Sequence, residues 1–174
     1  MLTLPAARGG DFSARRDAIS SGVHGRFGYL QAIAFYLLGA CSLVFAAAVW
    51  DELPGPLGVT AAILLALWDM GGILCGLWPI DAEGAPTTWA GRAHLTAAIS
   101  AFVFVLAGMF FATFAFRAKD SSSFWPVSFG FAIAALVAFL VSGVAQQRTS
   151  WGGLAQRVFI VVVLGWMMVA AVQT

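Results

Sequence analysis

The feature that most constrains the fold is a series of five apolar stretches that are almost free of charged residues. They cover residues 27–50, 57–80, 93–116, 124–145 and 154–172. Each is long enough to cross a bilayer, which takes about 20 apolar residues in a helix. Their apolar residues run continuously, whereas barrel strands alternate. The pattern predicts an all-α integral membrane protein, an antiparallel bundle of five transmembrane helices. A polar, partly interfacial segment at residues 1–26 precedes it.

Composition agrees with a membrane protein and excludes other classes. Of the 174 residues, 61% are hydrophobic and 10% are charged. Soluble domains have about 45–50% apolar and about 25% charged residues. Nine basic residues against eight acidic ones give no strong positive field, so we expect no nucleic-acid partner.

The distribution of basic residues predicts an orientation. We call face one the side that carries residues 1–26, 81–92 and 146–153, and face two the opposite side. Face two has Arg117 and Lys119. Face one, with the adjoining helix ends included, has Arg8, Arg15, Arg16, Arg26, Arg92, Arg148 and Arg157. Because basic residues gather on the cytoplasmic side, we expect a multi-pass protein of the cell inner membrane with its N-terminus and face one in the cytoplasm.

Three polar side chains are expected at similar depth on face one, on three different helices. Asp81 follows the second stretch, His94 opens the third and Arg157 opens the fifth. Such groups can form a charge-assisted network, and an imidazole held by a carboxylate can act as a general base. The three are candidate catalytic residues. We favour the alternative that they form a polar cluster fixing the helix ends, since ion-pair networks are often structural.

The two histidines, His24 and His94, both belong to face one. Two histidines can ligate a haem, or can hold a metal ion together with acids such as Asp17 and Asp81. The sequence has none of the usual ligand spacings of haem or metal sites. A cluster without such a motif is weak evidence for a site of this kind. We therefore predict no cofactor and no metal, with haem or metal at His24 and His94 as the alternative.

Asp69 is the one charged residue in the middle of an apolar stretch. It lies eleven residues before residue 80, which is about 16 Å along a helix. An acid at that depth is costly and is a candidate functional site. Gly72 and Gly76 share its helix face in a GxxxG pattern, which permits close helix approach. We favour a protonated or hydrogen-bonded Asp69 at a tight helix contact over a proton or ligand site.

Five short stretches carry a resemblance to a known family. They are FSARRDAIS at 12–20, GYLQ at 28–31, WPID at 78–81, TWAGRAH at 88–94 and GLAQRVF at 153–159. The chain resembles the bacterial and archaeal multi-pass membrane proteins grouped as domain of unknown function 998 (DUF998). The resemblance implies a helical membrane bundle with no established activity. It points to Ser20, Asp81, Trp89, Gly91, His94 and Arg157 as the polar positions typical of the family.

The resemblance also implies a difference at the N-terminus. Such proteins usually have another transmembrane helix before the FSxxR segment, where this sequence has residues 1–10. The implied bundle is one helix short, which would leave a groove for a partner.

These observations favour a non-catalytic accessory subunit or scaffold that packs with other membrane-protein subunits and with lipid. One alternative is an interfacial enzyme with Asp81 or His94 as base and Arg157 holding an anion. The other is a protein that binds a ligand or haem. The candidate ligand-binding residues are Ser20, His24, Asp69 and Trp89.

Overall fold

Each of the five apolar stretches forms one α-helix. The computed structural model describes residues 12–24, 27–119 and 123–173. After a short 3-10 helix, η2 (Ser20–His24), come α1 (Gly28–Glu52), α2 (Pro56–Leu77), α3 (Trp89–Ala118), α4 (Trp125–Arg148) and α5 (Gly152–Ala170). The described residues contain no strand, and the predicted all-α bundle is confirmed. Arg8 and Arg26, which entered the count of basic residues, lie outside the described residues.

The helix ends differ from those expected on hydropathy alone. The second helix ends at Leu77 because Trp78, which has an extended backbone, precedes Pro79, and the residue before a proline disfavours the helical region. The third helix begins at Trp89, four residues earlier than expected, because the Thr88 side chain accepts a hydrogen bond from the backbone N–H of Gly91. Such an N-cap replaces a missing intrahelical partner. His94 therefore lies inside α3 rather than at its start.

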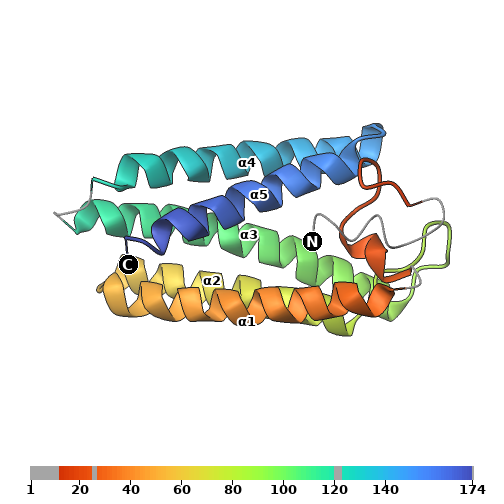
Figure 1. Ribbon diagram of the computed structural model, residues 1–174, viewed down its shortest axis with the longest axis horizontal. Helices are drawn as coiled ribbons and strands as arrows, with labels where there is room; N and C mark the ends of the chain where they lie inside the picture. The colour runs from red at the N-terminus through yellow and green to blue at the C-terminus, as the bar shows by residue number, and fades with distance from the viewer. Residues whose placement is uncertain (1–11, 25–26, 120–122, 174) are drawn as a thin grey trace.

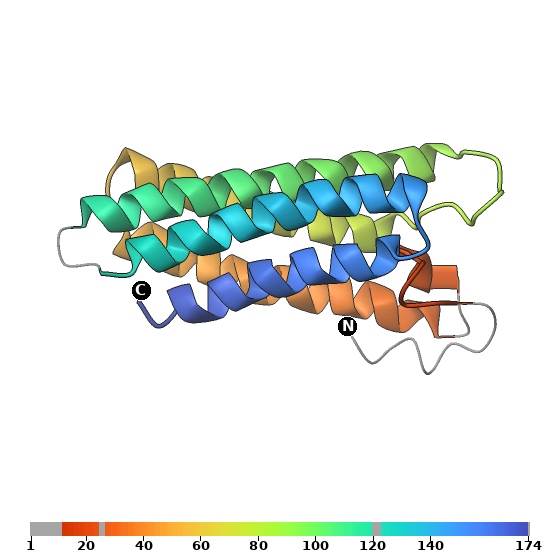
Figure 2. The same ribbon diagram turned by 90° about the horizontal axis from the view of Figure 1, so that it is seen from above.

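Consecutive helices run antiparallel and pack side by side. Figure 1 shows α3 in the middle, with α1 and α2 on one side and α4 and α5 on the other, and in the view from above in Figure 2 α3 runs along one edge of the bundle. The starts of α1, α3 and α5 and the ends of α2 and α4 gather at one end of the bundle. This end, which is face one, also carries η2 and the loop between α2 and α3. Segments far apart in sequence therefore meet there.

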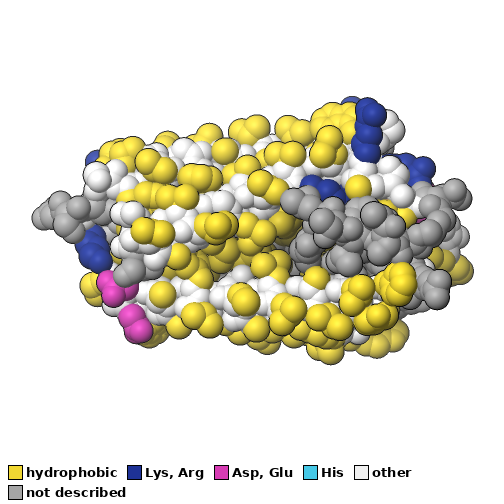
Figure 3. All heavy atoms as spheres, viewed as in Figure 1, with side chains coloured by type: hydrophobic (Ala, Val, Ile, Leu, Met, Phe, Trp, Pro, Cys, Tyr) yellow, Lys and Arg dark blue, Asp and Glu magenta, His cyan; other side chains and the backbone are white. Residues whose placement is uncertain are grey.

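The outer surface of the bundle is apolar. Figure 3 shows hydrophobic side chains over the body of the molecule, with the charged side chains of this face lying toward its ends. Large apolar residues stay exposed, such as Val44 at 72% and Met168 at 74%. All five helices are long and apolar enough to cross a membrane. The chain is a multi-pass membrane protein.

Small residues allow the helices of the first layer to approach closely. A Cβ on Gly71 of α2 would meet Ala101 of α3, and a Cβ on Gly39 of α1 would meet Ile73 of α2.

Of the two glycines of the GxxxG pattern, Gly76 makes the expected close contact, because a Cβ there would meet Tyr36 of α1. The expected role of Gly72 is wrong, because a Cβ there would have nothing within 4 Å. The close approach to α3 is made one residue earlier, at Gly71, which lies on the neighbouring side of the helix.

A chain of hydrogen bonds joins the three later helices inside the bundle. The Thr113 hydroxyl donates to the Met109 carbonyl oxygen at 2.8 Å, and the Ser128 hydroxyl lies 2.6 Å from that of Thr113. The indole Nε1 of Trp166 donates to the Ser128 oxygen at 2.9 Å. Because a hydroxyl has one proton, Ser128 donates to Thr113. These buried polar groups of α3, α4 and α5 satisfy one another.

Candidate functional site

The first candidate residue, Asp81, holds the start of α3. Its carboxyl oxygens accept hydrogen bonds from the backbone N–H of Thr88 at 2.9 Å and from the Thr88 hydroxyl at 2.7 Å. The same hydroxyl oxygen accepts from Gly91 N at 3.0 Å. The bonds from the Thr88 side chain and backbone, helped by the nearby charge of His24, lower the pKa of Asp81. An ionised carboxylate also suits a helix N-terminus.

The glycine at position 91 is required by this arrangement. A Cβ added to Gly91 would overlap the carboxyl group of Asp81. The WPID and TWAGRAH stretches therefore describe one structural unit, in which an acid folds over the first turn of the next helix. Trp89, which opens that turn, is exposed and packs edge-to-face on Trp78 at 5.9 Å between ring centroids.

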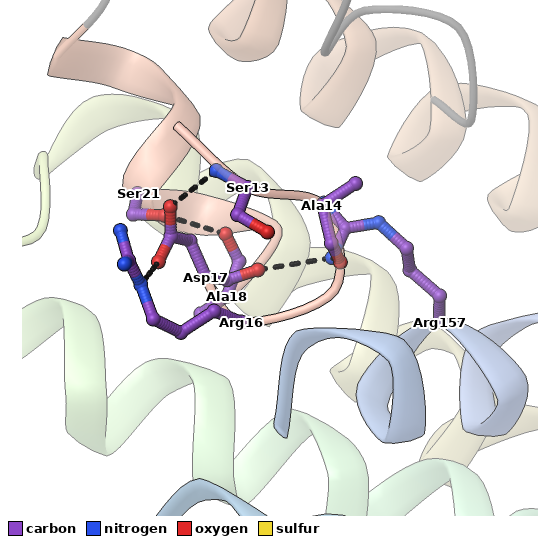
Figure 4. A network of polar contacts seen from close by, with 7 residues as sticks. All are labelled: Ser13, Ala14, Arg16, Asp17, Ala18, Ser21 and Arg157. Atoms are coloured by element: carbon purple, nitrogen blue, oxygen red, sulfur yellow. Dashed lines mark hydrogen bonds and ion pairs between the residues drawn. The ribbon is translucent and has the colours of Figure 1, made fainter. Parts of the chain in front are cut away.

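The second candidate, Arg157, holds the N-terminal segment on α5. From the first turns of α5 its Nη1 donates to the carbonyl oxygens of Ala14 at 2.7 Å and Asp17 at 2.9 Å (Figure 4). It also reaches Gly153 O at 2.9 Å. The backbone N–H groups of Gly153 and Leu154 donate to the carbonyls of Arg16 and Arg15. The segment thus supplies partners to N–H groups that a helix start leaves unpaired.

The turn that Arg157 holds is closed by Asp17. Its carboxylate accepts from the backbone N–H of Ser13 and from the Arg16 side chain, each at 2.7 Å (Figure 4). Partial burial opposes ionisation, but the bonds from Arg16 and Ser13 and the positive charges of Arg16 and Arg157 outweigh it and lower the pKa of Asp17. A Cβ on Gly153 would overlap the Asp17 carbonyl. The glycine therefore lets the turn sit directly on α5.

Beneath this segment lies a pocket of about 70 Å³ between α1, α2, α3 and α5. Its polar lining residues are Ser20, Asp69, Cys75, His94 and Gln156. Ile19 and Ser20, from the segment that Arg157 holds, lie at the pocket's edge toward face one. The Gln156 amide oxygen accepts from Ile19 N at 2.8 Å, which ties this edge to α5. The rest of the wall is apolar and includes Phe35, Trp68 and Phe102.

Asp69 is the least satisfied side chain in the pocket wall. It is 2% exposed, and neither carboxyl oxygen has a hydrogen-bond partner among the described residues. The Ser42 hydroxyl of α1 approaches the carboxyl group, but its geometry falls short of a hydrogen bond. Asp69 lies eight residues before the end of α2 at Leu77, which is about 12 Å along the helix.

His94 also lines the pocket and has a defined tautomer. It is 1% exposed, and its Nδ1 lies 2.7 Å from the Trp78 carbonyl oxygen. A carbonyl oxygen only accepts, so Nδ1 is the donor and the lone pair of a neutral imidazole is on Nε2. The Cys75 thiol donates to the His94 carbonyl at 3.7 Å, which fixes the same turn of α3 against α2.

The sequence candidates therefore divide between two places. Ser20, Asp69 and His94 line one pocket, while Asp81 and Arg157 make their described hydrogen bonds elsewhere, to Thr88 and to backbone carbonyls. His24 is exposed at the end of η2, on the side of Asp81. Within residues 12–24, 27–119 and 123–173, no three His, Cys, Asp or Glu side chains gather as metal ligands do.

Comparison with models of known protein families shows which family the chain belongs to. A family model described as protein of unknown function (DUF998) matches residues 2–173. The chain belongs to the DUF998 family. The predicted resemblance to this family is thereby confirmed. No curated protein and no solved structure is significantly similar to this DUF998 protein.

Gln156 is the site residue that sequence reasoning missed. It lies next to Arg157 in the GLAQRVF stretch, and it is buried at the start of a transmembrane helix. A glutamine at such a position is itself a signal, because its amide must find partners inside the protein.

The hydrogen bonds of Asp81 to Thr88 at the start of α3 predict that the stability of the protein depends on pH. Because the folded-state pKa of Asp81 is lowered, its contribution is complete at neutral pH and is lost as the pH falls below about 4. We expect the unfolding midpoint of Asp81→Asn to fall less between pH 6 and pH 3 than that of the unaltered protein. Glu83→Gln, in the same loop, is the control and should follow the unaltered protein. Identical profiles for all three would contradict the assigned role.

The hydrogen bonds between the N-terminal segment and α5 predict that this segment is protected from trypsin. Trypsin cleaves after Arg15 and Arg16, whose carbonyls are hydrogen-bonded to α5. Gly153→Ala should push the turn away and speed cleavage by about tenfold or more, which corresponds to about 1.4 kcal/mol of local destabilisation. Gly143→Ala, exposed on α4 with open space at its Cβ, should leave the rate unchanged. Equal rates for both variants would show that the segment is not seated as described.

Proposed function

We propose that this DUF998 protein is a non-catalytic membrane protein that binds a small ligand in the pocket between α1, α2, α3 and α5. The observation that carries the proposal is Asp69, a carboxyl group buried at membrane depth whose two oxygens lack partners among the described residues. Lipid offers no hydrogen bonds, and an unsatisfied polar group of this kind is costly. A bound molecule would supply the missing partner.

The surrounding geometry supports binding over catalysis. Asp81 and Arg157, the candidate base and anion holder, are engaged in holding α3 and the N-terminal segment. Their bonds account for their positions without a substrate. The pocket itself combines apolar walls with a few polar groups, Ser20, Asp69 and His94, and this mixture is typical of small-molecule sites.

An accessory role in a larger membrane complex is a second proposal. Exposed apolar side chains such as Leu37 and Leu140 suit both lipid and neighbouring membrane helices. Arg15, Arg16, Arg92 and Arg148 at face one support a cytoplasmic location of that face in a cell inner membrane. Isolation from native membranes in mild detergent should then yield stable partner subunits, and recovery of the chain with lipid alone would count against this second role.

Filling the pocket tests the binding function. Gly72 lines the pocket and has open space at its Cβ, so Gly72→Val should occupy the pocket without a clash. The probes are ethylammonium, ethanol and acetate, each added to purified protein in detergent while thermal unfolding is followed. At about ten times its dissociation constant a ligand adds about 1.4 kcal/mol, which raises the unfolding midpoint by about 3–6 °C. We expect at least one probe to do so saturably in the unaltered protein and none in Gly72→Val.

The matched control is Gly130→Val. Gly130 also has open space at its Cβ but lies exposed on α4, away from the pocket. This variant should retain the shift caused by the probe. Loss of the shift in both variants, or no saturable shift with any probe, would contradict the proposed function.

A further inference from the structure

The charges around the pocket limit the kind of ligand that fits it. Asp69 is the only acidic side chain among the described lining residues, and no lysine or arginine lines the pocket among them. An ionised carboxylate at this depth would have no counter-charge among the described residues that line the pocket. A cation in the pocket would supply both the opposite charge and the missing hydrogen bonds.

The other polar groups of the pocket favour a ligand that donates hydrogen bonds. The two Asp69 oxygens are acceptors, and the Nε2 atom of a neutral His94 is an acceptor when its Nδ1 donates to Trp78 O. Two other polar groups are engaged within the protein: the Gln156 amide oxygen accepts from Ile19 N, and the Cys75 thiol donates to His94 O. Since an ammonium group has three N–H donors and no acceptor, it complements the acceptors on Asp69 and His94, and the Ser20 hydroxyl in the same lining can accept as well.

The walls and the size of the pocket narrow the class further. Phe35, Trp68 and Phe102 contribute aromatic rings, whose faces attract cations and whose apolar surface accommodates a short alkyl group. An apolar cavity of about 150 Å³ holds benzene, which has six non-hydrogen atoms. The pocket of about 70 Å³ therefore takes a ligand of about three such atoms.

We propose that the pocket binds a small primary ammonium cation, with Asp69 as its counter-ion and hydrogen-bond acceptor. The proposal rests on the binding function proposed above and names the ligand class of that same site. The probe is ethylammonium, which has three non-hydrogen atoms and is charged at pH 7 as a lysine side chain is. Ligands of this size bind with dissociation constants of about 1 mM or weaker, so the titration extends to about 100 mM.

The experiment compares matched probes and matched variants by thermal unfolding of the purified protein in detergent. Ethanol is the neutral probe of equal size, sodium chloride is a cation without N–H donors, and N-methylglucamine chloride controls ionic strength. Asp69→Asn removes the charge while keeping the shape. Asp51→Asn removes an exposed charge at the end of α1 and is the control. We expect a saturable rise of the midpoint with ethylammonium alone in the unaltered protein and in Asp51→Asn.

Asp69→Asn should fold, because the substitution keeps the size of the side chain and removes no hydrogen bond to any described residue. Its dissociation constant for ethylammonium should rise about tenfold or more, as for the loss of a charge-assisted bond. If this variant does not fold, the probes carry the test: loss of the ethylammonium response in Gly72→Val places that ligand in the pocket, and a response to ethylammonium that exceeds those to ethanol and to sodium supports a cation with N–H donors, whereas equal responses overturn it.

Several outcomes would overturn the inference, and they separate it from the proposed function. A saturable response to ethanol or acetate that Gly72→Val abolishes, without one to ethylammonium, would leave a ligand pocket but refute the cation. An equal response to sodium would refute the need for N–H donors. An unchanged ethylammonium affinity in Asp69→Asn would refute the role of Asp69. No saturable response to any probe would overturn both proposals.

Discussion

A polar group in the hydrocarbon part of a membrane must find its hydrogen bonds within the protein or from a bound molecule, because lipid supplies none. Most of the buried polar groups described here form hydrogen bonds within the protein. Trp166, Ser128 and Thr113 satisfy one another across three helices, and His94 bonds to the Trp78 carbonyl. Asp69 stands apart, because its carboxyl oxygens are buried in a pocket wall without described partners. The proposed ligand follows from this exception.

A related need for hydrogen-bond partners at helix starts explains the short stretches that carry the resemblance to the family. The first turns of α3 and α5 have N–H groups without intrahelical partners. Thr88, positioned by Asp81, serves the first of these helices, and the carbonyls of Arg15 and Arg16 serve the second. Gly91 and Gly153 leave room for the groups that come this close. In this DUF998 protein, Asp81 thus holds the start of α3 at face one. Arg157 holds the segment whose residues Ile19 and Ser20 line the pocket.

Hydropathy was sufficient to predict five helices, because crossing a membrane leaves little choice of backbone structure. It did not predict where α2 and α3 meet the loop, since those ends depend on Pro79 and on the Thr88 cap. Asp69 stood out in the sequence because a charge at that depth is rare. Its lack of partners did not, because that depends on how α1, α3 and α5 surround it. Periodicity also placed Gly72 and Gly76 on the face of Asp69, but it did not reveal that Gly71 makes the contact with α3 while Gly72 faces open space.

The most direct test of the central claim observes the Asp69 carboxyl group itself. Nuclear magnetic resonance of protein labelled with ¹³C at the aspartate carboxyl carbon, with the Asp69 signal assigned by its loss in Asp69→Asn, would follow that group during an ethylammonium titration. The signal should shift saturably with ethylammonium, should not respond to ethanol, and should lose its response when Gly72→Val fills the pocket. An Asp69 signal that stays unchanged at saturating ethylammonium would contradict the account.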